Sequence, residues 1–266
     1  MKYTITSYGI SHVGLVRSNN EDVWDLLDEK NVYFLADGMG GHSAGEVAAQ
    51  ESINELRRWF IDHYKEPASP QEALFFLKEA FLAANDWVHL LSKQEKGWHG
   101  MGTTICCAWI IKETLIYAHV GDSRIYRFSK DRLDQLTQDH SLRQEFISKG
   151  YSPLPSKNII TRSIGITAHV EPDVGTCPVK AGEIYFLCSD GLSDTVSSSE
   201  MQQILLSSKN IEEASCSLVQ AAIDKGGNDN ITLVMISCVD ETENLPRQQR
   251  DNSDCPPCLE GDVKRA

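Results

Sequence analysis

Residues 34–49 read FLADGMGGHSAGEVAA, a stretch in which an apolar run stops at a single acid. The run predicts a buried strand, and the acid that ends it is Asp37, which is followed directly by Gly38. Residues 184–192, IYFLCSDGL, repeat the arrangement, with an apolar run that ends at Asp190 and a following glycine. Glycine lets a chain turn sharply and lets other groups approach its backbone. The two stretches therefore predict two strands that each present a carboxylate at one end.

Further strands and helices are predicted outward from these stretches over residues 1–240. Apolar residues recur at intervals of three and four in the helical segments, and short turns at 112–114 and 129–132 predict antiparallel hairpins. Strands are expected at 3–11, 22–28, 31–37, 103–111, 114–120, 124–129, 132–136, 183–188 and 231–239, and helices at 49–60, 70–92, 199–207 and 211–225. Because strands are grouped with strands and helices come in pairs, we expect an α+β fold in which two stacked antiparallel β-sheets are flanked by pairs of α-helices.

Three segments are interpreted from local sequence alone. Residues 140–166 predict a short helix and a loop, and Ser197 to Glu200 predict a capping box at the start of a helix. Residues 241–266 have few large apolar residues and no periodicity, so we expect a disordered tail after a domain of residues 1–240.

Composition and charge exclude several classes of protein. Of the 266 residues, 41% are hydrophobic and 24% are charged, which is enough apolar material for a packed core. The net charge of −13 argues against a surface that binds nucleic acid, because such surfaces need clustered Lys and Arg. The first residues contain no apolar signal-peptide core, and no apolar run approaches the ~20 residues that cross a membrane. A cytoplasmic protein that binds neither nucleic acid nor membrane is expected.

The chain has eight cysteines, of which Cys106, Cys107, Cys188 and Cys238 lie in apolar runs and are expected to be small buried hydrophobes. The exception is the CPPC sequence at 255–258, whose spacing suits a redox pair or half of a zinc site. No second CxxC completes a zinc site, and the sequence lies in the polar tail. Two exposed thiols are the favoured interpretation.

Several acids occupy the same kind of position, at the end of a predicted strand. They are Glu21, Asp22, Asp37, Asp122, Asp190 and Asp229. If the strands share two sheets, their ends can meet, and the carboxylates would repel one another unless cations or protons relieved the repulsion. Mg²⁺ and Mn²⁺ prefer such oxygen ligands. A single Asp-Gly pair is more often a turn than a ligand, so the interpretation depends on the whole set of acids together with Arg17.

Eight segments in order carry a resemblance to a known family. They are GLVRSNNED, LADGMGGHSAGEVAA, GTTICCAWI, AHVGDSRIYRF, LTQDHSL, NIITRSIG, LCSDGLSD and GGNDNITLV. Together they resemble the motif series of the metal-dependent protein phosphatases of type 2C, and of their bacterial branch in particular. The resemblance implies a β-sandwich flanked by helix pairs, with a flap at about 140–166 beside the active site.

The resemblance also implies a centre of two Mn²⁺ or Mg²⁺ ions and, in bacterial members, a third and weaker site. Asp37 resembles the acid that bridges two metals, and Gly38 resembles the residue that gives its carbonyl to the first metal. The remaining residues match ligands or their supports: Asp190 and Asp229 for the second metal, Glu21 directly or through water, Asp22 beside it, and Asp122 with Asp190 for the third metal.

The implied reaction is hydrolysis of phosphoserine and phosphothreonine monoesters by attack of a hydroxide that bridges the metals. Arg17 resembles the arginine that binds the substrate phosphate. Some relatives place a histidine after the Asp-Gly pair as a general acid, whereas this chain has Met39, which cannot donate a proton. His42 or a metal-bound water is the expected substitute. Lys157 and Arg162, in the flap, are expected to meet the charges of a phosphopeptide.

The expected partners are phosphorylated proteins and a cognate bacterial Ser/Thr kinase, whose signalling the phosphatase would reverse. No dimer interface is evident in the sequence, so a monomer is expected. Two other functions fit parts of the sequence. A non-catalytic module that binds phosphoproteins would be expected to lack a metal ligand, yet Asp37, Asp190 and Asp229 are all present. A nuclease or other phosphodiesterase would use the same two-metal chemistry, but the chain lacks a basic groove.

Overall fold

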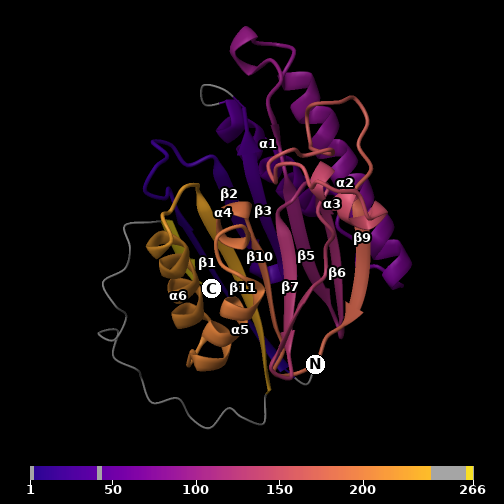
Figure 1. Cartoon of the computed structure of the whole chain (residues 1–266). Coiled ribbons are helices and arrows are strands. Elements are labelled where there is room, and N and C mark those ends of the chain that lie inside the picture. The colour runs from indigo at the N-terminus through magenta and orange to yellow at the C-terminus, as the bar shows by residue number, and fades with distance from the viewer. Residues whose placement is uncertain (1–2, 41–43, 241–261, 266) are drawn as a thin grey trace.

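The computed structural model describes residues 3–40, 44–240 and 262–265 (Figure 1). Its strands form two antiparallel sheets. The order of the first sheet is β12 (Asp262–Arg265), β1 (Tyr3–His12), β11 (Ile231–Asp240), β10 (Ile184–Cys188), β7 (Arg124–Ser129) and β8 (Arg132–Gln135). The order of the second is β2 (Asp22–Leu27), β3 (Val32–Met39), β5 (Ile105–Ile111), β6 (Thr114–Val120) and β9 (Asp173–Pro178), with β4 (Gly102–Thr103) paired to β3.

Two helix pairs cover the outer faces of the sheets, on opposite sides of the molecule in Figure 1. Helices α1 (Ala44–Asp62) and α2 (Pro70–Leu91) pack on the second sheet, and α5 (Ser198–Ser207) and α6 (Ile211–Asp224) pack on the first. Short helices α3 (Leu142–Lys149) and α4 (Asp190–Ser193) lie in connections. The predicted α+β fold, with two stacked antiparallel sheets flanked by helix pairs, is confirmed.

Strand β3 shows why the apolar runs are continuous. Successive side chains of a strand point to opposite faces of its sheet. Phe34 and Ala36 therefore pack toward the helices, whereas Tyr33 and Leu35 pack between the two sheets. Because both faces are covered, every position of the run is buried, and the first residue that needs solvent or a ligand is the acid at the end of the strand.

The structure contains two strands that the sequence did not predict. Strand β9 is an edge strand with mostly exposed side chains and contains Gly175 and Pro178, so neither its composition nor its hydrophobic pattern resembles a buried strand. Strand β12 falls within the segment 241–266 that was expected to be disordered, and that expectation is wrong for Asp262–Arg265. These residues pair with β1, whose edge would otherwise present unpaired backbone groups. The CPPC sequence lies outside the described residues.

The flap predicted at 140–166 lies in the connection from β8 of the first sheet to β9 of the second sheet. Helix α3 begins it, and isolated bridges join Ser141 to Ile160 and Thr103 to Ile164. Helix α2 holds the far end of the flap, because Asn85 accepts the Gly165 N–H at 3.0 Å. None of the helices in the described part of the chain has the length and apolarity that a membrane crossing requires.

Candidate metal centre

The acids of four strand ends meet where the two sheets come together. Asp22 on β2 is the register partner of Asp37 on β3. The other sheet contributes Asp190, which follows β10, and Asp229, which precedes β11. The Asp190 carboxyl lies within hydrogen-bonding reach of the Asp37 carboxyl. Residues up to 207 positions apart in the chain are thus brought to one place, as the strand-end pattern predicts.

The backbone at Asp37 is held by hydrogen bonds, which leaves its carboxylate available for a ligand. The Asp37 N–H donates to Thr104 Oγ1 at 3.1 Å, and the Asp37 carbonyl accepts from Thr103 Oγ1 at 2.8 Å and from the Thr104 N–H at 2.9 Å. The Gly38 N–H donates to the Glu21 carbonyl at 3.1 Å. Glu21 and Gly38 are therefore adjacent through the backbone, beside the carboxylates.

Close backbone packing explains the glycines of this site. A Cβ atom added to Gly38 would lie 2.2 Å from the Gly45 carbonyl oxygen, and one added to Gly45 would lie 2.4 Å from Glu21 Oε2. A Cβ added to Gly191 would lie 2.0 Å from the Asn230 carbonyl oxygen. Any side chain at these positions would push apart the elements that carry the acids. Gly38 and Gly191 are recognisable in the sequence because each follows an acid at a strand end, whereas Gly45, within residues 34–49, has no such signal.

Asn230 supports the site and was not identified from the sequence. Its side chain accepts the Glu21 N–H at 2.8 Å and donates to the carbonyls of Val13 at 3.0 Å and Asn19 at 2.9 Å. It therefore ties the start of β11 to the loop that carries Arg17. The only sequence signal is that Asn230 directly follows an expected ligand.

Ser189 is a second support that sequence reasoning missed. Its hydroxyl donates to Asp22 Oδ2 at 2.8 Å and accepts the Thr232 N–H at 3.0 Å. Ser189 directly precedes Asp190, so one short segment both supplies an expected ligand and orients a neighbouring acid.

The concentration of acids raises their pKa values. Burial is the largest cause and mutual repulsion adds to it, which raises the pKa of Asp22 and of Asp122 to about 7 and the pKa of Asp190 to about 6. Burial and the surrounding acids also raise the pKa of Asp37 well above its ordinary value. Burial raises the pKa of Glu21, although the nearby Arg17 opposes the shift. In the absence of a cation, these acids therefore hold protons more strongly than exposed acids do.

The donor set fits divalent metal ions. Asp22 Oδ1 and Asp122 Oδ1 are both buried, and neither has a hydrogen-bond partner among the described residues. An unpaired buried carboxylate oxygen is costly, and a cation at the oxygen removes that cost. The available donors are carboxylate oxygens together with the Gly38 carbonyl, which are the ligand types that Mg²⁺ and Mn²⁺ prefer.

Arg17 lies at the rim of the acid cluster. Its Nη2 atom is 2.9 Å from Asp229 Oδ2, and 54% of its side-chain surface is exposed. The charges of Asp229, Glu21 and Asp190 are close enough to contribute to its raised pKa. The guanidinium therefore lies beside the expected metal ligands and remains open to a ligand from solvent. Its role in binding phosphate stays a prediction.

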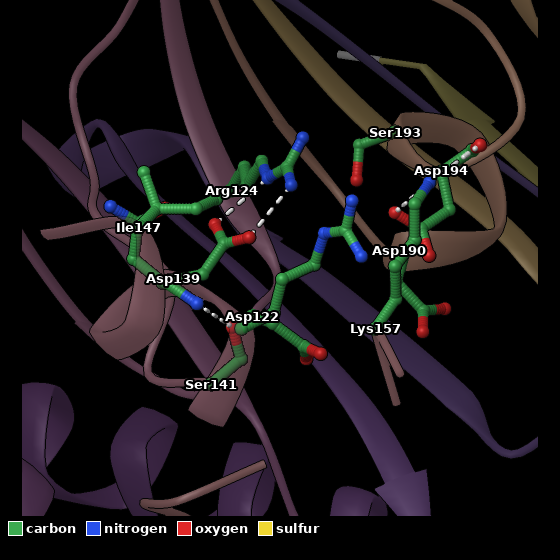
Figure 2. Close-up of a pocket in the computed structure, with 11 residues that line it drawn as sticks. Asp122, Arg124, Asp139, Ser141, Ile147, Lys157, Asp190, Ser193 and Asp194 are labelled. Carbon is green, nitrogen blue, oxygen red and sulfur yellow. Dashed lines mark hydrogen bonds and ion pairs between the residues drawn. The ribbon is translucent and has the colours of Figure 1, made fainter. Parts of the chain in front are cut away.

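A cavity of about 160 Å³ adjoins the site, and Figure 2 shows the residues that line it. Asp122 and Asp190 line it from the sandwich, and Ile147 lines it from the flap. In its wall, Arg124 makes a two-point contact with Asp139, at 2.8 Å and 2.7 Å. The expected third metal site thus opens toward the flap.

The structure describes two of the other three predicted site residues, Lys157 and Arg162. Lys157 lines the cavity and pairs with Asp194 at 3.1 Å. Arg162 is not among the residues that line it, and its Nη1 atom pairs with Asp173 Oδ1 at 2.6 Å. His42 lies outside the described residues. The roles of Lys157, Arg162 and His42 stay predictions.

Comparisons with known proteins agree with this geometry. The sequence profile of the protein phosphatase 2C family matches residues 11–224. The chain is 34% identical over 252 residues to the serine/threonine phosphatase stp of Listeria welshimeri, which covers 90% of this chain and 96% of that protein. It is 35% identical over 256 residues to the protein phosphatase PhpP of Streptococcus pneumoniae, which covers 87% of this chain and 97% of that protein.

Solved structures give the same result. The catalytic domain of the serine/threonine protein phosphatase PstP, crystallised with two manganese ions, matches with 34% identity and a TM-score of 0.79. The match covers 89% of this chain and all of that one. The serine/threonine phosphatase of S. agalactiae matches with 32% identity and a TM-score of 0.82, over 88% of this chain.

Proposed function

Because the chain belongs to the protein phosphatase 2C family, and is therefore a metal-dependent protein serine/threonine phosphatase, we propose that the acids at the junction of its two sheets bind the metal ions of the reaction. The proposed ligands of two Mn²⁺ or Mg²⁺ ions are Glu21, Asp37, Gly38, Asp190 and Asp229. Asp122 is proposed to hold a third and weaker ion together with Asp190. Asp22 is proposed to support the ligands from the adjacent strand.

Arg17 is the proposed contact of this chain with the substrate phosphate. When bound, the metal ions activate water and neutralise charge on the phosphoryl group. A guanidinium presents paired N–H donors that match two phosphate oxygens. Asp229 Oδ2 accepts from Arg17 Nη2 at 2.9 Å, and the guanidinium has further N–H donors for a phosphate.

The strongest support for the proposal comes from two unpaired carboxylate oxygens. Asp22 and Asp122 each keep a buried oxygen without a hydrogen-bond partner among the described residues, at a place where further acids repel them. An arrangement of this kind destabilises a metal-free protein, and bound cations would offset the cost.

The substrate side of the proposal involves the flap. Lys157 and Arg162 are proposed to meet charges of the phosphoprotein, which would require each to exchange its present acidic partner for the substrate. His42 is the proposed proton donor to the leaving group, because Met39 cannot donate a proton. In the cell, we propose that a monomer with its phosphatase domain at residues 1–240 reverses the action of a bacterial serine/threonine kinase in the cytoplasm.

Hydrolysis of a phosphothreonine peptide tests the function. The purified chain is assayed with and without Mn²⁺, with EDTA as the control, and a bis-aryl phosphodiester is assayed in parallel. Mn²⁺-dependent release of phosphate from the peptide alone is the expected result. Preferential cleavage of the diester would instead indicate a phosphodiesterase. Tight peptide binding without turnover by a folded, Mn²⁺-loaded protein would indicate a module that sequesters phosphoproteins.

A further inference from the structure

The ring of His140 makes an unusual contact with the backbone just before Asp122. The Gly121 N–H donates to His140 Nδ1 at 3.1 Å, and the His140 N–H donates to the Gly121 carbonyl at 2.9 Å. Both polar backbone groups of Gly121 are therefore bound by one residue. His140 lies 19 positions away in the chain, at the first residue of the flap.

Gly121 needs such a restraint. Its φ of +108° is a conformation that residues with side chains rarely adopt, and a Cβ atom there would lie 2.5 Å from Thr104. Glycine satisfies both constraints, but it also leaves the backbone free to rotate. Because Asp122 is the next residue, rotation at Gly121 would move the Asp122 carboxylate. Hydrogen bonds at both the N–H and the carbonyl of Gly121 prevent that rotation.

The neighbours of His140 determine which nitrogen of its ring accepts. His140 Nε2 lies 3.1 Å from Arg162 Nη1 and 3.3 Å from Asp173 Oδ2. Since Nδ1 accepts the Gly121 N–H, the neutral ring carries its proton on Nε2, and because a guanidinium cannot accept, that proton is donated to Asp173. Arg162 Nη1 donates to Asp173 Oδ1 at 2.6 Å and to the Glu171 carbonyl at 2.8 Å. Asp173 thus accepts from both His140 and Arg162. When one ring nitrogen of a histidine donates to an acid, the other nitrogen is left as a hydrogen-bond acceptor.

His119 completes the packing around this ring. The two imidazoles stack with centroids 4.4 Å apart and planes inclined by 21°, and the exposed fractions of His119 and His140 are 2% and 7%. His119, His140 and Asp173 each offer a ligand atom within 4.8 Å of the others. Nearly parallel rings do not direct two in-plane lone pairs at one ion, however, and the Arg162 guanidinium already supplies the cation for Asp173. The arrangement therefore suits orientation of His140 rather than metal binding.

We propose that His140 is a positioning residue, which holds Gly121 through Nδ1 and so aims the Asp122 carboxylate at the weaker metal site. The inference rests on the proposed function, because that function assigns Asp122 to a metal. His140 also connects the flap to Asp122, because the His140 carbonyl accepts the Thr161 N–H at 2.8 Å across the two arms of the flap. Asp122 Oδ1, buried and without a partner among the described residues, is the atom whose direction is set.

Two conservative variants of His140 separate its two contacts. His140→Asn keeps an acceptor at the covalent position of Nδ1 and loses the contact with Asp173. His140→Gln can place a donor near the position of Nε2 but has no acceptor at the position of Nδ1. Both variants are polar and smaller than or similar to histidine, so both are expected to fold. His63→Leu, at an exposed histidine that stacks on Trp59, is the matched control.

The primary measurement is Mn²⁺ binding, followed by the electron paramagnetic resonance signal of free Mn²⁺ during titration. We expect His140→Gln to weaken the weakest Mn²⁺ site about tenfold, as removal of an orienting partner does at other metal sites. His140→Asn and His63→Leu are expected to bind as the wild type does. Hydrogen exchange of the Gly121 amide should be faster in His140→Gln than in His140→Asn.

A double-mutant cycle tests whether His140 acts through Asp122. In an Asp122→Asn background, His140→Gln should have no further effect on Mn²⁺ binding. Equal binding by all single variants, a loss in His140→Asn rather than His140→Gln, or additive effects in the cycle would each overturn the inference. Absence of Mn²⁺-dependent phosphopeptide hydrolysis by the wild type would instead count against the proposed function, and the binding titration would still decide the role of His140.

Discussion

The Asp190 carboxyl lies in a place that favours its neutral form. Burial, and after it the charges of Asp229 and Asp194, raise its pKa to about 6. A group in such a place contributes little to the stability of a metal-free protein and a great deal to the binding of a cation. Its proposed role is therefore to bind a metal ion.

Replacing Asp190 with Asn should separate these two effects. Asp190→Asn is expected to abolish Mn²⁺-dependent hydrolysis of a phosphothreonine peptide, because it removes a charged ligand. The same change should raise the melting temperature of the metal-free protein, because it removes one repelling charge. Phosphatase assays and thermal unfolding in EDTA measure the two effects. An Asp190→Asn protein that retains Mn²⁺-dependent turnover would contradict the assignment of this ligand.

Gly191 lies where the packing leaves no room for a side chain. A Cβ atom there would meet the Asn230 carbonyl oxygen at 2.0 Å, and neither backbone can yield without moving an expected ligand. Gly191→Ala is expected to lower the free energy of unfolding by about 1–3 kcal/mol, the usual range for overpacking, and to weaken Mn²⁺ binding. Urea denaturation and Mn²⁺ titration check this. Gly97→Ala is the control, since nothing lies within 4 Å of its Cβ position, and an equal loss in both variants would refute the explanation.

Among the elements, helix α5 begins with the capping box that its sequence predicts. Ser197 Oγ accepts the Glu200 N–H, and the Glu200 side chain accepts the Ser197 N–H, so the predicted capping box is confirmed. Ser197→Ala is expected to lower the free energy of unfolding by about 1 kcal/mol, because it leaves a backbone N–H of the first turn without its partner. Ser198→Ala, at an exposed neighbour within the helix, should have a much smaller effect in the same denaturant titration. Equal effects would show that the cap is not the cause.

Strands were predicted where burial gives them a pattern and missed where it does not. The predicted ranges of β3, β5, β6 and β10 agree with the structure to within two residues because both faces of these strands are covered. Edge strand β9 has no such pattern, and it exists because β6 offers it a ladder of backbone hydrogen bonds. Backbone pairing of this kind depends on a partner that local sequence does not specify.

For the whole molecule, metal binding, pH and stability are linked through the acid cluster. The pKa values of Asp22 and Asp122 in the folded protein, about 7, lie above their ordinary value of 3.8. Between these pH values the folded protein holds protons that the unfolded chain has lost. The contribution of these acids to stability is therefore fully present below about pH 4 and is lost as the pH rises through about 7.

Mn²⁺ should reverse this loss. Since metal ligands must be deprotonated, Mn²⁺ competes with protons for the same acids. We expect the rise in melting temperature on adding Mn²⁺ to be larger at about pH 8 than at about pH 5.5. Thermal unfolding with Mn²⁺ and with EDTA at both pH values measures the difference, in which the titration of other groups largely cancels. A rise that is independent of pH, or larger in acid, would show that the acid cluster does not bind the metal.

The sequence by itself determined the layers of this protein and the family to which it belongs. Continuous apolar runs such as 31–37 require cover on both faces, and acids that follow such runs lie at strand ends, so the fold class and the expected ligands could be read locally. Only the tertiary structure decided which groups support them. Asn230 acts on Glu21 across 209 positions, and Ser189 acts on Asp22 across 167. The hold of His140 on Gly121 likewise depends on how the flap meets the sheet. The physical reason is that burial leaves a periodic trace along the chain, whereas a hydrogen bond between distant residues exists only after the backbone has brought its two ends within about 3 Å.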